Sequence, residues 1–273
     1  MAVRGWTIAV AALLTGFAAQ AQETASKPRL LFVMAHPDDE VFVAPAIARA
    51  TRKGQPVTVV FATSGDQGPG VTDMERSAAL AELREGEARC SMAALGGPEA
   101  RFLRLGDGTL GVAAHHPESS AQKFAEALGP ILAEGDFEMV FTWGPDGGYG
   151  HADHRMVSAL TTQLVQAMGD DRPALLFPGI RAGTLPPVPE MQTWAVTDPA
   201  LLDIPIEYGP DDLAAAARAV GCHESQFDAA TRAGMMPLFD QSIWQGAVHF
   251  RFGLPEHIRA VETHAEPGPL PRP

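Results

Sequence analysis

The stretch Leu30-Leu31-Phe32-Val33-Met34-Ala35-His36-Pro37-Asp38-Asp39-Glu40 decides the fold of this chain. An apolar run that predicts a strand at 29–35 leads directly into one imidazole and three carboxylates, and a helical pattern follows at about 40–53. In α/β proteins, strand ends that open into polar helix starts carry the binding and reactive groups. The stretch therefore predicts an α/β protein with functional side chains after its first strand.

The alternation of strand and helix continues along the chain. The strand runs are near-continuously apolar, as at 57–61, which is typical of a parallel sheet that helices cover on both faces. The sequence therefore predicts an α/β fold with a Rossmann-like, mostly parallel sheet. The further expected strands lie at 57–63, 101–105, 137–143 and 174–178, and the further expected helices at about 74–95, 119–134 and 152–168.

The pattern loosens after residue 180. Strand-like runs at 193–196 and 204–207 precede a helical pattern at about 211–223, and residues 225–262 show no clear periodicity. We therefore expect a looser C-terminal portion that contains β-structure. Trp194 and Trp244 in this region are interpreted as packing residues.

The first 21 residues have the features of a secretory signal peptide. Arg4 provides a positive start, residues 8–18 are apolar, and Ala19-Gln20-Ala21 is a small-x-small cleavage site. We therefore expect a secreted or periplasmic protein that has no membrane anchor after cleavage.

The remaining chain is long enough for one domain. It has 273 residues in total, 46% of them hydrophobic, and we expect a single domain at 29–263. A polar leader at 22–28 precedes this domain, and a Pro-rich tail at 264–273 follows it.

The charge of the chain argues against nucleic acid as a partner. The formal net charge is −13, and removing Arg4 with the signal peptide makes it −14. The oligomeric state is not set by these features. Cys90 and Cys222 are the two cysteines, and the sequence leaves open whether they form one disulfide or two buried thiols.

A second polar cluster, Gly150-His151-Ala152-Asp153-His154, follows the strand expected at 137–143. His151 and His154 are three residues apart, as are His36 and Asp39, a spacing that lets two side chains converge. Each cluster alone could be an acidic helix start or an exposed helix face. If these two strands are parallel and neighbouring, the clusters meet at one sheet edge, and we expect them to form an N/O metal site with open positions.

The two clusters, Ala35 to Glu40 and Gly147 to His154, resemble the PIG-L/LmbE-like family of zinc-dependent N-deacetylases. The resemblance spans roughly residues 29–226. Three further elements match in order: Thr63-Ser64-Gly65-Asp66, Arg84-Glu85-Gly86-Glu87 and His223-Glu224-Ser225-Gln226.

The resemblance implies a role for each residue of the two clusters. Zn²⁺ would be bound by His36, Asp39 and His154, although a His/His/Asp site also accepts Fe²⁺. Asp38 would be the general base, His151 would steady the oxyanion, and Asp153 would orient an imidazole beside it. Glu40 is expected only to begin the helix.

Four residues outside the metal set are expected near the substrate. Arg84 would help to hold it, although an i,i+3 surface pair with Glu87 is the simpler interpretation. Asp66 replaces the Glu usual in the family. Tyr149 could stack on a sugar or pack in its loop, and His223 could line the pocket or be a core histidine.

The expected function is that of a secreted metal-dependent hydrolase that removes an N-acetyl or N-acyl group from an N-acetylglucosamine-type sugar or glycoconjugate. Water activated by zinc would attack, with Asp38 as the base. One alternative is an N-acyl amidohydrolase that acts on a non-sugar metabolite. Another is a non-catalytic secreted protein that binds a metal or a glycan.

Overall fold

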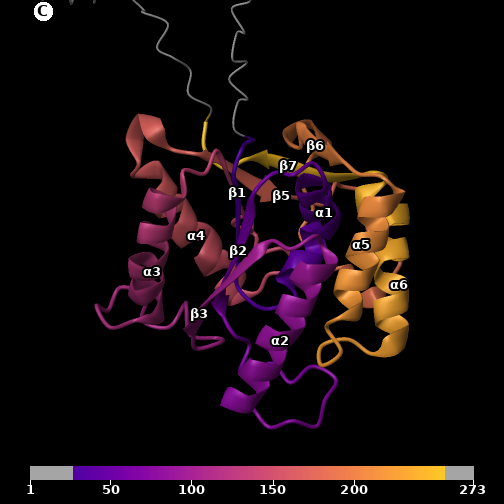
Figure 1. Cartoon of the computed structure of the whole chain (residues 1–273), viewed down its shortest axis with the longest axis horizontal. Coiled ribbons are helices and arrows are strands. Elements are labelled where there is room, and N and C mark those ends of the chain that lie inside the picture. The colour runs from indigo at the N-terminus through magenta and orange to yellow at the C-terminus, as the bar shows by residue number, and fades with distance from the viewer. Residues whose placement is uncertain (1–26, 256–273) are drawn as a thin grey trace, which may run out of the picture.

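The computed structural model describes residues 27–255, which form a seven-stranded sheet flanked by helices (Figure 1). The strand order is β3-β2-β1-β4-β5-β7-β6. The strands are β1 (Leu30–Met34), β2 (Val57–Thr63), β3 (Glu99–Leu105), β4 (Met139–Thr142), β5 (Ala174–Pro178), β6 (Ile204–Glu207) and β7 (Ala247–Phe252).

Two of the predicted segments, the signal peptide at 1–21 and the tail at 264–273, lie outside the described residues, as does most of the leader at 22–28. Between residues 27 and 255, no helix combines the length and the apolar character that crossing a membrane requires.

The sheet confirms the predicted Rossmann-like arrangement. β1 pairs in parallel with β2 on one side and with β4 on the other, and β3 and β5 extend the parallel order outward. The chain builds the sheet outward from β1 to β3 and then returns to place β4 beside β1. The boundary between β1 and β4 is therefore the topological switch point, where open α/β sheets bind ligands.

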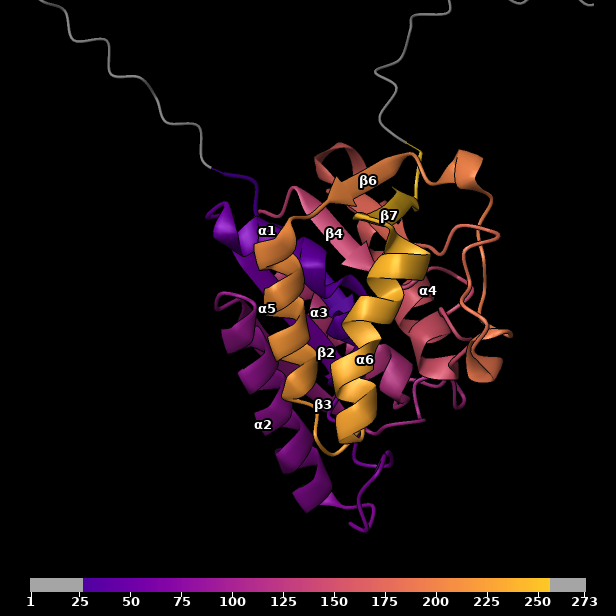
Figure 2. The same cartoon turned by 90° about the vertical axis from the view of Figure 1, so that its right-hand side faces the viewer.

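Helices cover both faces of the sheet (Figures 1 and 2). The longer helices are α1 (Ala44–Arg52), α2 (Ala78–Ala94), α3 (Ser120–Gly135), α4 (Ala152–Gln166), α5 (Pro210–Gly221) and α6 (Ala229–Phe239). The short helical turns are Asp39–Val43, Gly169–Asp171, Pro189–Met191, Pro199–Leu201 and Asp240–Trp244.

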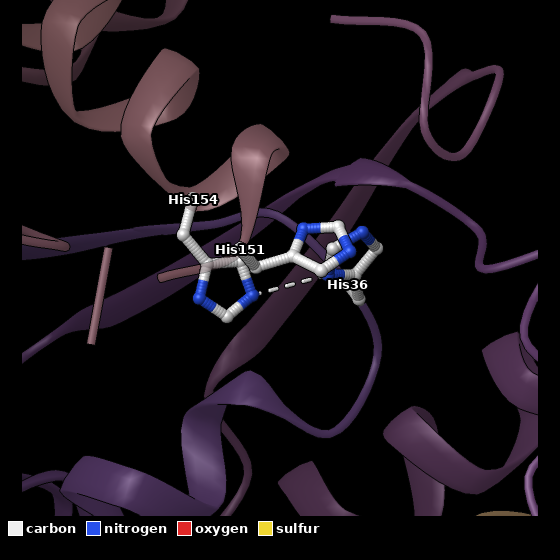
Figure 3. Close-up of side chains that lie close together, drawn as sticks. All are labelled: His36, His151 and His154. Carbon is white, nitrogen blue, oxygen red and sulfur yellow. Dashed lines mark hydrogen bonds between the residues drawn. The ribbon is translucent and has the colours of Figure 1, made fainter. Parts of the chain in front are cut away.

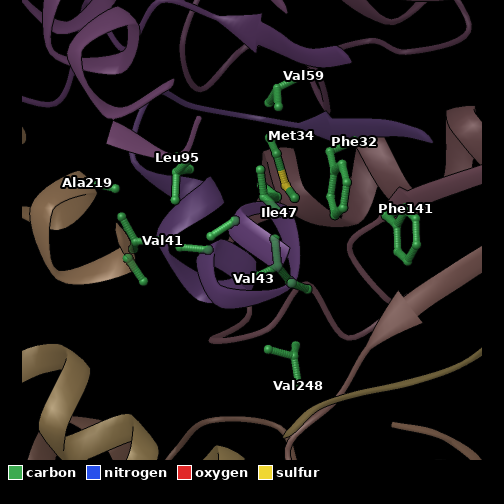
Figure 4. Packing of buried hydrophobic residues seen from close by; sticks show 14 of the residues in the cluster. Phe32, Met34, Val41, Val43, Ile47, Val59, Leu95, Phe141, Ala219 and Val248 are labelled. Atoms are coloured by element: carbon green, nitrogen blue, oxygen red, sulfur yellow. The ribbon is translucent and has the colours of Figure 1, made fainter. Parts of the chain in front are cut away.

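Successive side chains of β1 point to opposite faces of the sheet, so the core has two layers. Phe32 and Met34 pack with Ile47 of α1 on the face that also carries α2, α5 and α6 (Figure 4). Leu31 and Val33 point to the opposite face, which α3 and α4 cover. Both faces of β1 are buried, which is why the strand reads as a continuous apolar run.

The C-terminal portion differs in detail from the expectation. Residues 193–196 form no strand, whereas the unassigned stretch after 225 contains α6 and β7. Gly234 and Pro237 within α6 obscured its helical period. β7 runs antiparallel to both of its neighbours and joins β6 to the main sheet.

A disulfide links α2 to the residue that follows α5. Cys90 and Cys222 are bonded, with their Cα atoms 5.8 Å apart. The structure thereby resolves the choice that the sequence left open between a bridge and free thiols.

Candidate metal centre and active site

The first polar cluster folds back on the end of β1 through the carboxylate of Asp39. Its Oδ2 accepts hydrogen bonds from the backbone N–H groups of Ala35 at 2.8 Å and His36 at 2.9 Å. The indole Nε1 of Trp143 donates to the same oxygen at 3.1 Å. Oδ1 therefore faces away from these donors and lies 3.0 Å from Nε2 of His154.

His154 is oriented by the loop before α4. Its Nδ1 lies 3.1 Å from the carbonyl oxygen of Gly147, which fixes the tautomer and leaves Nε2 free to bind a metal. Gly147 has a φ of +72°, and a Cβ there would lie 2.9 Å from the carbonyl oxygen of His151. The ring of Trp143 stacks on the imidazole of His154 at 4.4 Å.

Three donor atoms converge at the switch point. Nδ1 of His36 lies 3.3 Å from Nε2 of His154 (Figure 3) and 3.8 Å from Oδ2 of Asp39. A tetrahedral ion with bonds of about 2.0–2.1 Å places its ligand atoms about 3.3 Å apart. The distances from His154 Nε2 to His36 Nδ1 and to Asp39 Oδ1, 3.3 and 3.0 Å, are close to this value, and the three residues predicted as ligands lie together.

The far side of the His36 imidazole is lined by carboxylates. Nε2 of His36 lies 3.0 Å from Asp107 Oδ1 and 3.5 Å from Asp153 Oδ2. Burial lowers the pKa of His36, but Asp107, Asp153 and Asp39 together raise it well above its usual value. The carboxylates around His36 thus favour a positive charge in this cluster.

The loop after β3 holds Asp153 and also contains Asp107. Asp153 accepts hydrogen bonds from the N–H groups of Gly108 at 2.7 Å and Leu110 at 3.2 Å. Its Oδ2 lies 3.5 Å from Nε2 of His36, so it can orient the imidazole of His36. Sequence reasoning missed Asp107, although it follows β3 at the same sheet edge, which is the signal that could have identified it.

His151 begins α4 and faces the donor set (Figure 3). Its Nδ1 accepts a hydrogen bond from the N–H of Asp153 at 3.2 Å, so the neutral ring carries its hydrogen on Nε2. Burial lowers the pKa of His151, and repulsion from His36 and His154 lowers it further. The donor atoms of the three histidines lie within 4.8 Å of one another, so the three rings form a group that could hold a metal ion.

Asp38 occupies a strained backbone conformation between two anchors. Its φ is +117°, a region that non-glycine residues rarely adopt. Its N–H donates to Oε2 of Glu40 at 3.0 Å, and Arg84 Nη2 donates to its Oδ2 at 3.0 Å. Burial raises the pKa of Asp38 to about 6, although the Arg84 guanidinium opposes this shift.

Glu40 does more than begin a helix, contrary to the expectation from the sequence. It is fully buried, and its Oε1 accepts hydrogen bonds from Ser91 Oγ at 2.5 Å and His223 Nε2 at 2.6 Å. Burial raises the pKa of Glu40, but His223 and Ser91 lower it below its usual value overall. Glu40 and His223 form a buried pair behind Asp38, so His223 does not reach the solvent or the cavity.

Arg84 and Glu87 do not form the surface ion pair that their spacing allows. Both are buried, and Glu87 accepts hydrogen bonds from the N–H and hydroxyl of Ser225 at 2.7 and 2.6 Å. Arg84 also donates to the carbonyl of Gly65 at 3.1 Å. Gly65 has a φ of +68°, and a Cβ there would lie 2.2 Å from the guanidinium, so the close approach requires glycine.

A cavity of about 320 Å³ opens beside Asp38 and Asp39. Tyr149, which is 49% exposed, and Trp194 belong to its lining. Trp194 also packs against Phe42 and Phe239, as expected of a packing residue. Asp66 lies elsewhere, where it accepts a hydrogen bond from the backbone N–H of Asp107 at 3.1 Å.

The chain is similar to known deacetylases in sequence. The sequence profile of the family described as PIG-L: GlcNAc-PI de-N-acetylase matches residues 31–165. A 1D-myo-inositol 2-acetamido-2-deoxy-alpha-D-glucopyranoside deacetylase of Mycolicibacterium gilvum is 33% identical over 229 residues, which are 76% of this chain and 79% of that protein. The protein of the same description from Actinosynnema mirum is 40% identical over 157 residues, 51% of this chain and 56% of its own length.

The fold is also similar to that of a solved structure. The N,N'-diacetylchitobiose deacetylase from Pyrococcus horikoshii, complexed with its inhibitor MPG, superposes with a TM-score of 0.62 at 18% identity. The superposition covers 87% of each chain.

Proposed function

Because the chain belongs to the PIG-L family of GlcNAc-PI de-N-acetylases, we propose that it is a metal-dependent hydrolase that removes the N-acyl group from an N-acylated amino sugar. One observation carries the proposal. Asp38 and Asp39 line the same cavity, and Arg84 holds the carboxylate of Asp38 outside the three-donor set, where it could move protons. A carboxylate with a raised pKa beside a metal site is typical of hydrolytic chemistry.

The donor set would hold Zn²⁺ or Fe²⁺ through His36, Asp39 and His154. When bound, the ion would polarise the amide carbonyl and lower the pKa of water. Asp107 and Asp153 would orient the His36 imidazole from its other nitrogen.

Asp38 would act as the general base and then as the general acid. It would take a proton from the attacking water and deliver it to the nitrogen of the leaving amine. The amide C–N bond breaks, and the products are a carboxylic acid and a free amine. Glu40 and Arg84 would keep the carboxylate in place while the proton moves.

His151 would donate a hydrogen bond to the oxyanion that develops on the acyl carbonyl. Its lowered pKa favours the neutral ring, and the contact of Nδ1 with the N–H of Asp153 places the ring hydrogen on Nε2. A preorganised donor of this kind stabilises the transition state more than the ground state.

We also propose export from the cytoplasm. The sequence of residues 1–21 supports it, and so does the Cys90–Cys222 disulfide, since such bonds persist in oxidising compartments. N-terminal sequencing of protein recovered from fractionated cells tests this. A mature protein that begins at Gln22 outside the cytoplasm supports export, whereas an uncleaved cytoplasmic protein contradicts it.

The activity is tested by measuring free amine released from N-acetylglucosamine glycosides. We expect release that a chelator abolishes and that Zn²⁺ or Fe²⁺ restores. A parallel panel of N-acyl amino acids tests the alternative that the substrate is not a sugar. Failure of the metal-loaded protein to release amine from any N-acyl sugar would overturn the proposed function.

A further inference from the structure

The cavity beside Asp38 and Asp39 is much more apolar than a sugar ring requires. Its other lining residues are almost all hydrophobic or aromatic, among them Phe42, Trp143, Tyr149, Trp194, Met235 and Phe239. The two aspartates supply its carboxylates, and the volume of about 320 Å³ lies within the range of small-molecule sites.

The aromatic wall is built from separate elements that hold one another in place. The ring of Phe42 lies 5.3 Å from Trp143, 6.3 Å from Phe239 and 6.5 Å from Trp194. Trp194 lies 6.2 Å from Phe239 and 6.1 Å from Tyr149. These rings come from four parts of the chain: the turn after β1, the segment after β4, the loop before β6, and helix α6. Because the rings contact one another, the wall is preformed.

The chemistry of this wall selects an apolar occupant. A sugar ring inside the cavity would bury several hydroxyl groups, and each unpaired one would cost free energy. Trp143 has already committed its indole N–H to Asp39. An alkyl chain needs no hydrogen-bond partner and gains from every methylene removed from water.

The position of the cavity identifies which part of the substrate is apolar. The carbonyl carbon under attack must lie beside Asp38 and the donor set, and the acyl chain is bonded directly to that carbon. A group at the anomeric position of an amino sugar is separated from it by the nitrogen, two ring carbons and an oxygen. The acyl chain therefore has the shortest path into a cavity that begins at Asp38 and Asp39.

From these observations we propose that the cavity is an acyl-chain subsite and that the preferred substrates carry N-acyl groups longer than acetyl. This inference rests on the proposed function. An acetyl methyl group is about the size of one water molecule, roughly 30 Å³, and would leave most of the cavity unfilled. Hydrolysis of the longer amide releases the fatty acid and the amino sugar, with water as the other reactant.

A substrate series tests the subsite. The metal-loaded protein is assayed for amine release from methyl glycosides of glucosamine that carry N-acetyl, N-butanoyl, N-hexanoyl or N-octanoyl groups. We expect kcat/KM to rise from acetyl to hexanoyl, by roughly two- to fourfold for each methylene. A maximum at acetyl with a decline for longer chains would overturn the proposal while leaving the deacetylase function in place.

A second series distinguishes the acyl chain from an apolar aglycone. N-acetylglucosamine is presented as methyl, butyl and hexyl glycosides, and we expect kcat/KM to stay nearly constant. A steep rise in this series, with none in the acyl series, would assign the cavity to the aglycone and overturn the acyl subsite. No amine release from any member of either series would overturn the proposed function itself.

Variants of the wall supply an independent readout. Trp194→Ala and Met235→Ala should each lower the ratio of hexanoyl to acetyl kcat/KM, by roughly tenfold for the tryptophan. Phe102→Ala is the matched control, because Phe102 packs on Phe61 and lies outside the cavity lining. Its ratio should equal that of the wild type, and unchanged ratios in both wall variants would contradict the subsite.

Discussion

Arg84 donates hydrogen bonds both to the carboxylate of Asp38 and to the backbone carbonyl of Pro37, the residue before it. The same Nη2 atom donates to Asp38 Oδ2 at 3.0 Å and to the carbonyl oxygen of Pro37 at 2.7 Å. The guanidinium therefore fixes both the carboxylate and the strained backbone that presents it. Arg84, expected from the sequence to hold substrate, lies where it positions the proposed base.

Replacing the proposed base tests its role. Asp38→Asn should lower kcat by roughly 10²- to 10⁴-fold, because an amide cannot accept the proton of water. The variant should still bind metal, since Asp38 is outside the donor set. Amine release and metal content are measured together, with the exposed Asp73→Asn as the control. Wild-type turnover in Asp38→Asn would contradict the mechanism.

The role of Arg84 is tested by separating kcat from KM. Arg84→Lys keeps the charge but loses the fork that reaches Asp38 and Pro37, so Asp38 should be misplaced and kcat should fall roughly ten- to a hundredfold. KM should change little if Arg84 acts through Asp38. A raised KM with an unchanged kcat would instead indicate that Arg84 binds the substrate directly.

Metal binding should raise the melting temperature, because the ion binds the folded donor set. Zn²⁺ at a hundredfold excess over its Kd should stabilise the wild type by about 2.7 kcal/mol, and His154→Ala should lose most of this gain. The exposed His115→Ala is the control. Equal metal-induced shifts in His154→Ala and wild type would exclude His154 as a ligand.

Glu85 predicts a pH-dependent contribution to stability. The hydrogen bond from Arg104, with those from Ser64 and Arg89, lowers its pKa from 4.5 to about 2 despite its burial. The stabilisation is therefore complete above pH 4.5 and is lost as the pH falls from there towards 2. Because Arg104 and Arg89 are largely exposed, the effect should be about 1 kcal/mol.

Urea unfolding of Glu85→Gln and wild type measures this contribution. The wild type should be more stable at pH 7. The difference should shrink at pH 3, because Glu85 is then protonated in the unfolded chain while it stays mostly ionised in the folded protein. Glu82→Gln, an exposed position on the same helix, should show no difference at either pH. A constant difference for Glu85→Gln at both pH values would rule out the charge as its source.

The disulfide should contribute to both stability and activity. Removing it by Cys90→Ser/Cys222→Ser should lower the free energy of unfolding by about 2–4 kcal/mol. Its chain neighbours Ser91 and His223 both hold Glu40, which in turn holds the backbone of Asp38, so kcat should fall as well. The reduced wild type should have the same stability and kcat as the double variant. If reduction changes neither the free energy of unfolding nor kcat, the disulfide contributes to neither.

The sequence predicted the parts of the site that lie next to strand ends. His36, Asp39 and His154 could be placed together on the condition that their two strands are parallel neighbours, and the pairing of β1 with β4 meets that condition. The helical stretch expected at about 74–95 begins only at Ala78, where the Ser77 hydroxyl accepts a hydrogen bond from the N–H of Leu80. Local patterns were sufficient for these features.

Long-range partners could not be predicted in the same way. Glu40 resembled an ordinary acidic helix start, and only the packing of α2 and α5 against it brings Ser91 and His223 to its carboxylate. Trp194 joins the cavity through a loop with no regular period. α6 was missed because Gly234 and Pro237 interrupt its pattern, although it supplies part of the aromatic wall.

The position of β7 between β5 and β6 determines when the sheet can be completed during synthesis. β6 is made before β7 but pairs only with β7, which itself lies against β5. Until residues 247–252 leave the ribosome, the edge of β5 has no strand beside it and β6 has nowhere to bind. The chain therefore carries its complete set of metal ligands well before its sheet is closed, and the pairing edge of β5 stays open until β7 is in place.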